Sequence, residues 1–201
     1  MSGGRITVGV SGAGSNLRAL QAAAERGELG GEIVLVFADR ACPALDWAVE
    51  QGIETALVPG GDDDTLAETL AGARPDVVAL AGYMRILGPS VLAAYDGRTL
   101  NTHPSLLPAF PGIRAIEQAL AYGAKVFGVT VHYVEPGEVD SGPVILQGAV
   151  EAPGAREPAD VLAAIRPLEH ALLPRAVALI AAGAVRRDPD HPRRVVVDAP
   201  G

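Results

Sequence analysis

The sequence predicts an α/β fold with a doubly wound, mostly parallel β-sheet. Short, β-branched apolar runs alternate with longer amphipathic segments rich in Ala and Leu between residues 5 and 81. The apolar runs are almost unbroken, which is typical of parallel strands that helices cover on both faces. A glycine-rich turn follows the first run, at the position where such folds bind ligands. The resulting β-α-β-α-β-α-β order indicates a doubly wound sheet.

The first half of the chain contains alternating predicted strands and helices. The strands are expected at Arg5–Val10, Glu32–Ala38, Glu54–Val58 and Asp76–Ala81. The helices are expected at Asn16–Arg26, Pro43–Gln51 and Asp64–Ala73. Because a helix separates each strand from the next, neighbouring strands are expected to be parallel.

The pattern changes after Gly82. A short helix, a short strand and a longer helix are expected at Pro89–Tyr95, Thr99–Thr102 and Gly112–Tyr122. Two longer strands follow at Lys125–Val134 and Pro143–Glu151. The loop between them is rich in turn-forming and acidic residues, which predicts an antiparallel pair.

One long helical stretch, Pro158–Ala182, is expected near the C-terminus. Pro167 and Pro174 lie inside it, and because each proline removes a helix hydrogen bond, a break or kink is expected near them. The residues beyond the stretch are polar and proline-rich. We therefore expect a single domain over residues 1–185 and a C-terminal tail over residues 186–201.

Composition narrows the classes of function. The 201 residues carry a net charge of −8 with a pI of about 4.9, which argues against a broad nucleic-acid footprint. A single cysteine, Cys42, cannot form an internal disulfide or a structural zinc site. No uncharged apolar run approaches the roughly 18 residues that span a bilayer, and residues 1–5 lack a signal-peptide core. A cytoplasmic protein is expected.

The glycine-rich turn, Ser11–Asn16, connects the first strand to the first helix. Its glycines let the backbone approach an anion, and the helix N-terminus supplies N–H groups and a positive dipole end. Ser15 or Asn16 is expected to cap the helix or to bind a phosphate oxygen. A dinucleotide site fits less well, because Leu17 occupies the third glycine position and Asp39 alone is a weak match to a ribose-binding acid. A plain capped turn and a monophosphate site stay open.

Residues Asn101–Pro108 form the most unusual stretch of the chain. Asn101 and His103 are two residues apart, so their side chains face one side of an extended segment. Pro104 restricts His103 to that extended geometry. Asp140, in the acidic loop between the two long strands, is expected to pair with His103 and to stabilise its imidazolium form. Taken singly, these features also fit a structural histidine and a solvated turn.

Other chemistries fit less well. One histidine and one acid do not make a zinc site, and Ser105 lacks the G-x-S-x-G context of a nucleophile. Cys42 stands at a helix start without a local base, and Trp47 on the same helix is expected to pack. His132 fits either the core or the neighbourhood of the site.

Seven segments share an order and spacing with a known family. They are Ser11–Asn16, Leu80–Leu87, Asn101–Pro108, Phe110–Gly112, Gly128–Val134, Asp140–Gln147 and Glu169–His170. Together they resemble the phosphoribosylglycinamide formyltransferase family, folate-dependent enzymes also called GAR transformylases. The resemblance covers nearly the whole chain and implies a Rossmann-like formyltransferase fold.

The resemblance implies that the formyl group of 10-formyltetrahydrofolate passes to the amine of glycinamide ribonucleotide in de novo purine synthesis, without a metal. The amine would attack the formyl carbon, and a tetrahedral intermediate would collapse to the products. His103 would be the general acid/base, Asn101 would donate to the oxyanion, and Asp140 would support His103 and organise a proton-carrying water.

The same resemblance implies the binding residues. Gly14, Ser15 and Asn16 would hold the substrate phosphate, and Glu169 would contact that substrate. The folate would be bound by Met84, Arg85, Ile86, Leu87, Asn101, Glu138, Val139 and Asp140. The family often has a folate-contacting arginine after the third strand, whereas Pro59–Asp64 offers an acidic run that suits a solvated loop and helix N-terminus.

Three alternatives remain. A methionyl-tRNA formyltransferase would need a tRNA-binding region for which residues 186–201 are too few, and a net charge of −8 disfavours tRNA. A formyltetrahydrofolate hydrolase would need a regulatory region before Arg5. A non-catalytic or NAD-dependent nucleotide-binding protein is disfavoured by Leu17 and by the polar cluster around His103. The expected partners are therefore the ribonucleotide and the folate, without nucleic acid or membrane, and a monomer or homodimer is expected.

Overall fold

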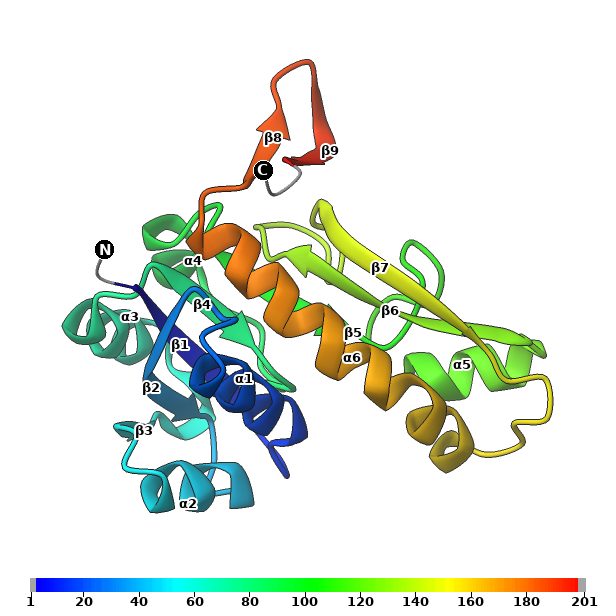
Figure 1. Cartoon of the computed structure of the whole chain (residues 1–201), viewed down its shortest axis with the longest axis horizontal. Coiled ribbons are helices and arrows are strands. Elements are labelled where there is room, and N and C mark those ends of the chain that lie inside the picture. Colours follow the sequence, from blue (N-terminus) through cyan, green and yellow to red (C-terminus); the bar gives the residue numbers. More distant parts are fainter. Residues whose placement is uncertain (1–2, 199–201) are drawn as a thin grey trace.

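A computed structural model describes residues 3–198 of the chain (Figure 1). Its main sheet has seven strands in the order β3-β2-β1-β4-β5-β6-β7. The strands are β1 (Gly4–Val10), β2 (Gly31–Ala38), β3 (Thr55–Leu57), β4 (Val77–Leu80), β5 (Thr99–His103), β6 (Val126–Tyr133) and β7 (Val144–Glu151). Strands β1 to β5 pair in parallel, whereas β6 is antiparallel to both β5 and β7. The predicted doubly wound sheet with an antiparallel strand pair is confirmed.

Helices pack against both faces of this sheet. They are α1 (Ser15–Glu25), α2 (Pro43–Glu50), α3 (Asp63–Ala73), α4 (Pro89–Ala94), α5 (Ala115–Tyr122) and α6 (Pro158–Ala181), with a 3₁₀ turn η1 (Pro59–Gly61) before α3. Helix α1 lies beside α6 over one face, and α3 and α4 pack together over the other (Figure 1). Helix α5 begins later than the predicted Gly112, because Arg114 adopts a φ of +57° that cannot continue a right-handed helix.

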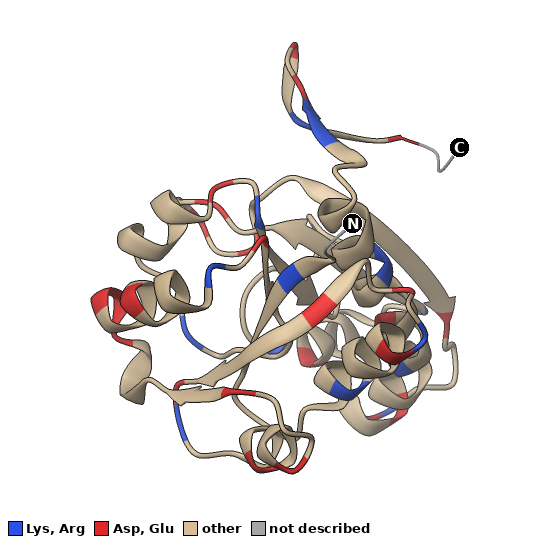
Figure 2. Ribbon diagram, turned by 60° about the vertical axis from the view of Figure 1, so that its left-hand side comes forward, with Lys and Arg blue, Asp and Glu red and all other residues tan. Residues whose placement is uncertain are grey.

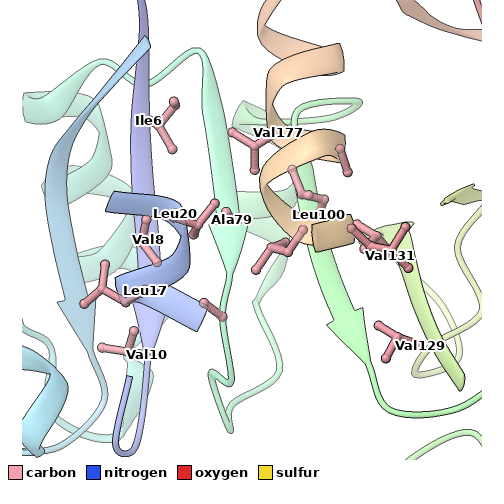
Figure 3. Close-up of a cluster of buried hydrophobic side chains, with 14 of the residues drawn as sticks. Ile6, Val8, Val10, Leu17, Leu20, Ala79, Leu100, Val129, Val131 and Val177 are labelled. Carbon is pink, nitrogen blue, oxygen red and sulfur yellow. The ribbon is translucent and has the colours of Figure 1, made fainter. Parts of the chain in front are cut away.

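Alternate residues of the strands enter two separate cores. Val77 and Ala79 of β4 face the α1/α6 side, whereas Val78 and Leu80 face the α3/α4 side. This alternation explains why an apolar residue is buried at every position of β4. Figure 3 shows the first core, in which side chains from β1, α1, β5 and β6 gather with Val177 of α6.

The carboxyl ends of β1, β4 and β5 meet at one edge of the sheet. Leu80, the last residue of β4, pairs with Asn101 of β5, and the N–H of Ala81 donates to Gly9 of β1. The strand order reverses between β1 and β4, which is the point where doubly wound sheets bind ligands. The loops after these three strands therefore lie where a ligand would bind.

Helix α6 corrects one prediction. It runs unbroken with Pro167 and Pro174 inside it, so of the expected break or kink the break is wrong. Each proline removes only one N–H donor, and Pro174 is itself buried in the packed face. Ile165 and Leu173 are buried in the same face, and each such side chain contributes about 1.5–3 kcal/mol. This burial offsets the lost hydrogen bonds, which are each worth about 1 kcal/mol net.

The predicted tail contains a hairpin. Strands β8 (Val185–Asp188) and β9 (His191–Val197) pair antiparallel and form a sheet of their own. Residues 199–201 of the predicted tail, and residues 1–2 at the other end of the chain, lie outside the described residues.

Acidic and basic residues are interspersed over the ribbon (Figure 2). An anionic ligand on such an acidic protein has to be bound by groups of its own site, because the overall charge repels it. Across residues 3–198 the structure has no helix that is both long and apolar enough to cross a membrane.

Candidate active site

Strand β5 carries two of the predicted site residues on one face. The loop between β6 and β7 brings Asp140 to them. Asn101 donates from Nδ2 to Oδ1 of Asp140 at 3.4 Å, and Nδ1 of His103 lies 3.2 Å from Oδ2. The side chains of His103 and Asp140 are only 6% and 8% exposed. The expected contact between imidazole and carboxylate is present, in a place largely shielded from water.

Asp140 is held in an unusual backbone conformation. Its φ of +56° lies in the left-handed region that non-glycine residues rarely adopt. The N–H of Gly112 donates to Oδ2 at 2.8 Å. Burial by itself raises the pKa of Asp140, but the hydrogen bond from His132, the N–H of Gly112 and the charge of His103 outweigh it and lower that pKa. Asp140 is therefore a carboxylate at neutral pH.

His132 is a fourth member of the cluster. Antiparallel pairing places it opposite Asn101. Its Nε2 lies 3.3 Å from Nδ2 of Asn101 and 3.5 Å from Oδ1 of Asp140, and its Nδ1 lies 2.8 Å from the carbonyl oxygen of Tyr133. The sequence left its position open between core and site. The signal that identifies it is the pairing register of β5 with β6, which the sequence pattern does not specify.

Both ring nitrogens of His103 face oxygen atoms. Nδ1 faces Asp140, and Nε2 lies 2.9 Å from the carbonyl oxygen of Phe110. Only the imidazolium form can donate a hydrogen bond to both oxygens. The loop that supplies this carbonyl contains one cis peptide bond, Leu107–Pro108. The cluster thus offers a proton donor, a carboxylate and an amide N–H donor within a few ångströms of one another.

The glycine-rich turn ends at the start of α1. Gly14 is the N-cap, with a φ of +78°, and a Cβ there would stand 2.7 Å from the Cβ of Ala44. The expectation that Ser15 or Asn16 caps the helix is wrong, because close packing against α2 requires a glycine at the N-cap and shifts both residues into the first turn. The first-turn N–H groups therefore have no side-chain cap, an arrangement that suits an anion.

Asn16 meets Glu169 of α6 across the packed helix pair. Burial raises the pKa of Glu169, and a hydrogen bond from Asn16 and the charge of Arg166 partly offset this effect. The Oδ1 atom of Asn16 is buried without a hydrogen-bond partner among the described residues. The structure thus joins two predicted substrate-binding residues that are far apart in the sequence.

The carboxylate of Asp39 links this turn to the segment after β4. Ser11 donates to Asp39 at 2.5 Å and accepts from the N–H of Met84 at 2.8 Å. Arg40 and Arg85 lie 2.7 and 3.2 Å from Oδ2 of the same carboxylate. Burial raises the pKa of Asp39, but its hydrogen bonds from Arg40, Ser11 and Arg85 lower it overall to about 2. Protein groups occupy both oxygens, which argues against a ribose-binding role.

The predicted folate-binding residues differ in exposure. The side chains of Met84 and Ile86 are largely exposed, as is that of Val139 in the loop that carries Asp140. Leu87 is buried in the second core, so only its backbone can meet a ligand. Glu138 is exposed beside Val139. Of these, Val139 directly precedes Asp140, so exposed apolar surface lies beside the polar cluster, which suits a flat heterocycle.

The acidic residues after β3 accept hydrogen bonds at the N-termini of helices, as expected. Asp62 caps α3 by accepting from the N–H of Thr65 at 3.0 Å. Asp63 accepts from the N–H groups of Ser90 and Val91 at the start of α4. This segment therefore ties two helices together.

The remaining candidates lie outside the cluster. Ser105 donates to the carbonyl oxygen of Ala109 at 2.6 Å, which builds it into its own loop. Cys42 is buried at the N-cap of α2, and Trp47 packs under Arg18, whose guanidinium lies 5.2 Å from the ring centre. Within residues 3–198, His, Cys, Asp and Glu side chains nowhere form a group of three arranged to hold a metal ion.

A doubly wound sheet with an amide, an imidazole and a carboxylate at its ligand-binding edge is typical of an α/β enzyme that uses acid–base chemistry. The sequence pattern of the formyl transferase family matches residues 4–177, and the chain belongs to that family.

Named relatives agree with this assignment. The chain is 44% identical over 184 residues to phosphoribosylglycinamide formyltransferase of Mycobacterium tuberculosis, covering 88% of this chain and 85% of the relative. It is 38% identical over 189 residues to the Escherichia coli enzyme of the same name, covering 90% and 89%. Among solved structures, glycinamide ribonucleotide transformylase 1 from Symbiobacterium toebii superimposes with a TM-score of 0.92 at 39% identity, over 97% of this chain and 94% of that one.

Proposed function

We propose that this enzyme transfers the formyl group of 10-formyltetrahydrofolate to the amine of glycinamide ribonucleotide in de novo purine synthesis. The observation that carries the proposal is the contact of Asn101 and His103 with Asp140 at the ligand-binding edge. The names of the relatives in M. tuberculosis and E. coli support the same acceptor.

The cluster suits direct attack of the amine on the formyl carbon. Attack places negative charge on the formyl oxygen of a tetrahedral intermediate. Nδ2 of Asn101 donates to that oxygen, and the positive charge of His103 in its imidazolium form stabilises it. As the intermediate collapses, His103 gives a proton to the leaving folate nitrogen, and the former amine nitrogen gives up a proton that a water held by Asp140 carries back to His103. The reaction needs no nucleophile from the protein.

The ribonucleotide is bound on the α1 side of the edge. The uncapped N–H groups after Gly14, together with Ser15 and Asn16, hold its phosphate. Glu169, whose pKa is affected by the neighbouring Asn16, contacts the same substrate. The phosphate and the rest of the ribonucleotide therefore contact two neighbouring residues, Asn16 and Glu169.

The folate is bound between the segment after β4 and the Asp140 loop. Met84 and Ile86 supply exposed apolar surface, Val139 supplies more from the loop, and Glu138 lies beside it. Arg85 is held by Asp39, and Leu87, whose side chain is buried, would contact the folate through its backbone. These positions leave Asn101 and Asp140 to contact the formyl-bearing end.

The proposal is tested by the spectral change that accompanies release of the folate product. Purified protein is mixed with 10-formyltetrahydrofolate and either glycinamide ribonucleotide, methionyl-tRNA or no acceptor. Turnover that requires the ribonucleotide is expected. Turnover with tRNA instead would identify a tRNA formyltransferase, and turnover without any acceptor would identify a hydrolase; either result would overturn the proposal.

A further inference from the structure

The C-terminal hairpin reaches the loop that carries Asp140. Figure 1 shows β8 and β9 standing apart from the main sheet. Arg193 of β9 nevertheless donates from Nη2 to the carbonyl oxygen of Ser141 at 2.8 Å. Because Ser141 directly follows Asp140, the hairpin holds the chain one residue from the catalytic carboxylate.

The hairpin is itself fixed to the body of the protein. Val185 and Val195 pack against the main core. Arg187 of β8 lies 2.6 Å from Oε1 of Glu135, the second residue after the end of β6 at Tyr133. The hairpin thus contacts the β6–β7 loop near both of its ends.

Arg193 faces the body of the protein, while its neighbour does not. Alternate residues of a strand share a face, so Arg193 lies on the side of the core-packed Val195. Arg194 lies on the other side and pairs within the hairpin with Asp188 at 3.4 Å. Arg193 also borders, together with Asp140, a cavity of about 200 Å³.

The β6–β7 loop needs stabilising contacts because the backbone conformation of Asp140 is energetically unfavourable. A non-glycine residue in the left-handed region, as Asp140 is, costs about 1–3 kcal/mol and persists only where surrounding contacts fix it. Within the loop, Ser141 donates from Oγ to the carbonyl oxygen of Glu138 at 2.6 Å. Arg193 adds a charged donor from outside the loop, and hydrogen bonds to charged groups are the stronger ones.

We propose that Arg193 is a positioning residue that holds the Asp140 loop in its catalytic conformation. The proposal rests on the proposed function, because it assigns Arg193 a role in the same formyl transfer. Arg193 does not touch the reacting atoms; it acts through the Ser141 carbonyl on the direction in which the Asp140 carboxylate points.

The test compares Arg193→Ala with the matched control Arg194→Ala. In Arg193→Ala, kcat is expected to fall about tenfold while KM for the ribonucleotide changes less than twofold, since small displacements of catalytic groups are costly and the phosphate turn is untouched. Arg194→Ala should match the unchanged protein. Equal kcat values for all three proteins would overturn the proposal.

A pH profile separates positioning from a merely structural role. His103, His132 and the N–H of Gly112 face Asp140 and lower its pKa, with Arg193 at the cavity rim. Loosening the loop weakens these contacts, so the acid limb of kcat should move to higher pH in Arg193→Ala and return in Arg193→Lys. An acid limb that stays in place in Arg193→Ala would refute positioning.

A titration independent of activity distinguishes this proposal from the proposed function. Carboxyl-carbon NMR of Asp140 in the unchanged protein and in Arg193→Ala reports the same shift to higher pH. If the unchanged protein transfers no formyl group, the proposed function fails, whereas identical Asp140 titrations in both proteins show that Arg193 does not hold the loop.

Discussion

The parallel and antiparallel halves of the sheet contribute different groups to the site. The parallel half, β1 to β4, supplies the turn Ser11–Asn16 and the segment around Met84, each directly after a strand. The antiparallel half is β5 to β7, in which β6 runs antiparallel to both of its neighbours although β5 itself is parallel to β4. It supplies Asn101 from β5, His132 from β6 and Asp140 from the loop beyond. In the proposed mechanism, the phosphate-binding groups therefore come from a local strand–helix turn, whereas the reacting groups are brought together by strand register and by a constrained loop.

The two halves also differ in how far apart along the chain the residues lie that determine their structure. A turn after a parallel strand is specified by nearby residues, such as the glycine that fits against Ala44. The reacting cluster depends on contacts between segments about 30–50 residues apart, from Asn101–His132 to Ser141–Arg193. Helix α6 packs on both halves and holds them in one core.

Removal of His103 gives the largest expected effect and tests whether chemistry is confined to the antiparallel half. In His103→Ala, kcat should fall on the order of 10³-fold, since general acid–base catalysis contributes about 10²–10⁴. KM for the ribonucleotide should change less than twofold, because the phosphate turn is untouched. Steady-state kinetics with both substrates check this. Near-normal turnover would falsify the role of His103.

The sequence predicted the strands of both halves equally well: the ends of all seven strands of the main sheet lie within one residue of the predicted ends. What the sequence did not predict are the contacts between segments that are distant along the chain. The roles of His132 and Arg193 depend on pairing register and on a hairpin docking far along the chain. The Asp39–Arg85 pair likewise joins segments whose proximity no local pattern encodes.

The start of α1 and the prolines of α6 show a different reason why the sequence predictions failed. Propensity favours Ser15 or Asn16 as a cap, but close packing of two helices overrode it at Gly14. Propensity also favours a break at Pro167, but burial of one helix face overrode it. In both places tertiary packing outweighed a local preference worth about 1–3 kcal/mol.

Substitution of Asp39 tests how the parallel half is stabilised. The pKa of Asp39 falls from 3.8 to about 2 on folding, so its contacts contribute about 2 kcal/mol above pH 4 and are lost as the pH falls from about 4 to about 2. Asp39→Asn should therefore lower the free energy of unfolding by about 2 kcal/mol at pH 7 and by about half as much at pH 3. Urea unfolding at both pH values measures the difference.

Two results would contradict that account of Asp39. One is a stability difference that stays constant from pH 7 to pH 3, which would show that the charge is unimportant. The other is an equal loss in Asp46→Asn, which changes an exposed carboxylate on α2 and serves as the matched control. The half-exposed guanidiniums of Arg40 and Arg85 can return to water, which keeps the expected loss modest.

The smallest effect should come from Asn16 and tests whether the parallel half binds without reacting. Asn16→Ala should raise KM for the ribonucleotide about tenfold, which corresponds to about 1.4 kcal/mol, and change kcat less than twofold. The reason is that Asn16 supports both the phosphate turn and Glu169 but does not touch the His103 cluster. Gln21→Ala on the same helix, whose amide donates to Glu25, is the control and should change neither constant. If KM for the folate rises instead, the phosphate belongs elsewhere and the division between a binding half and a reacting half fails.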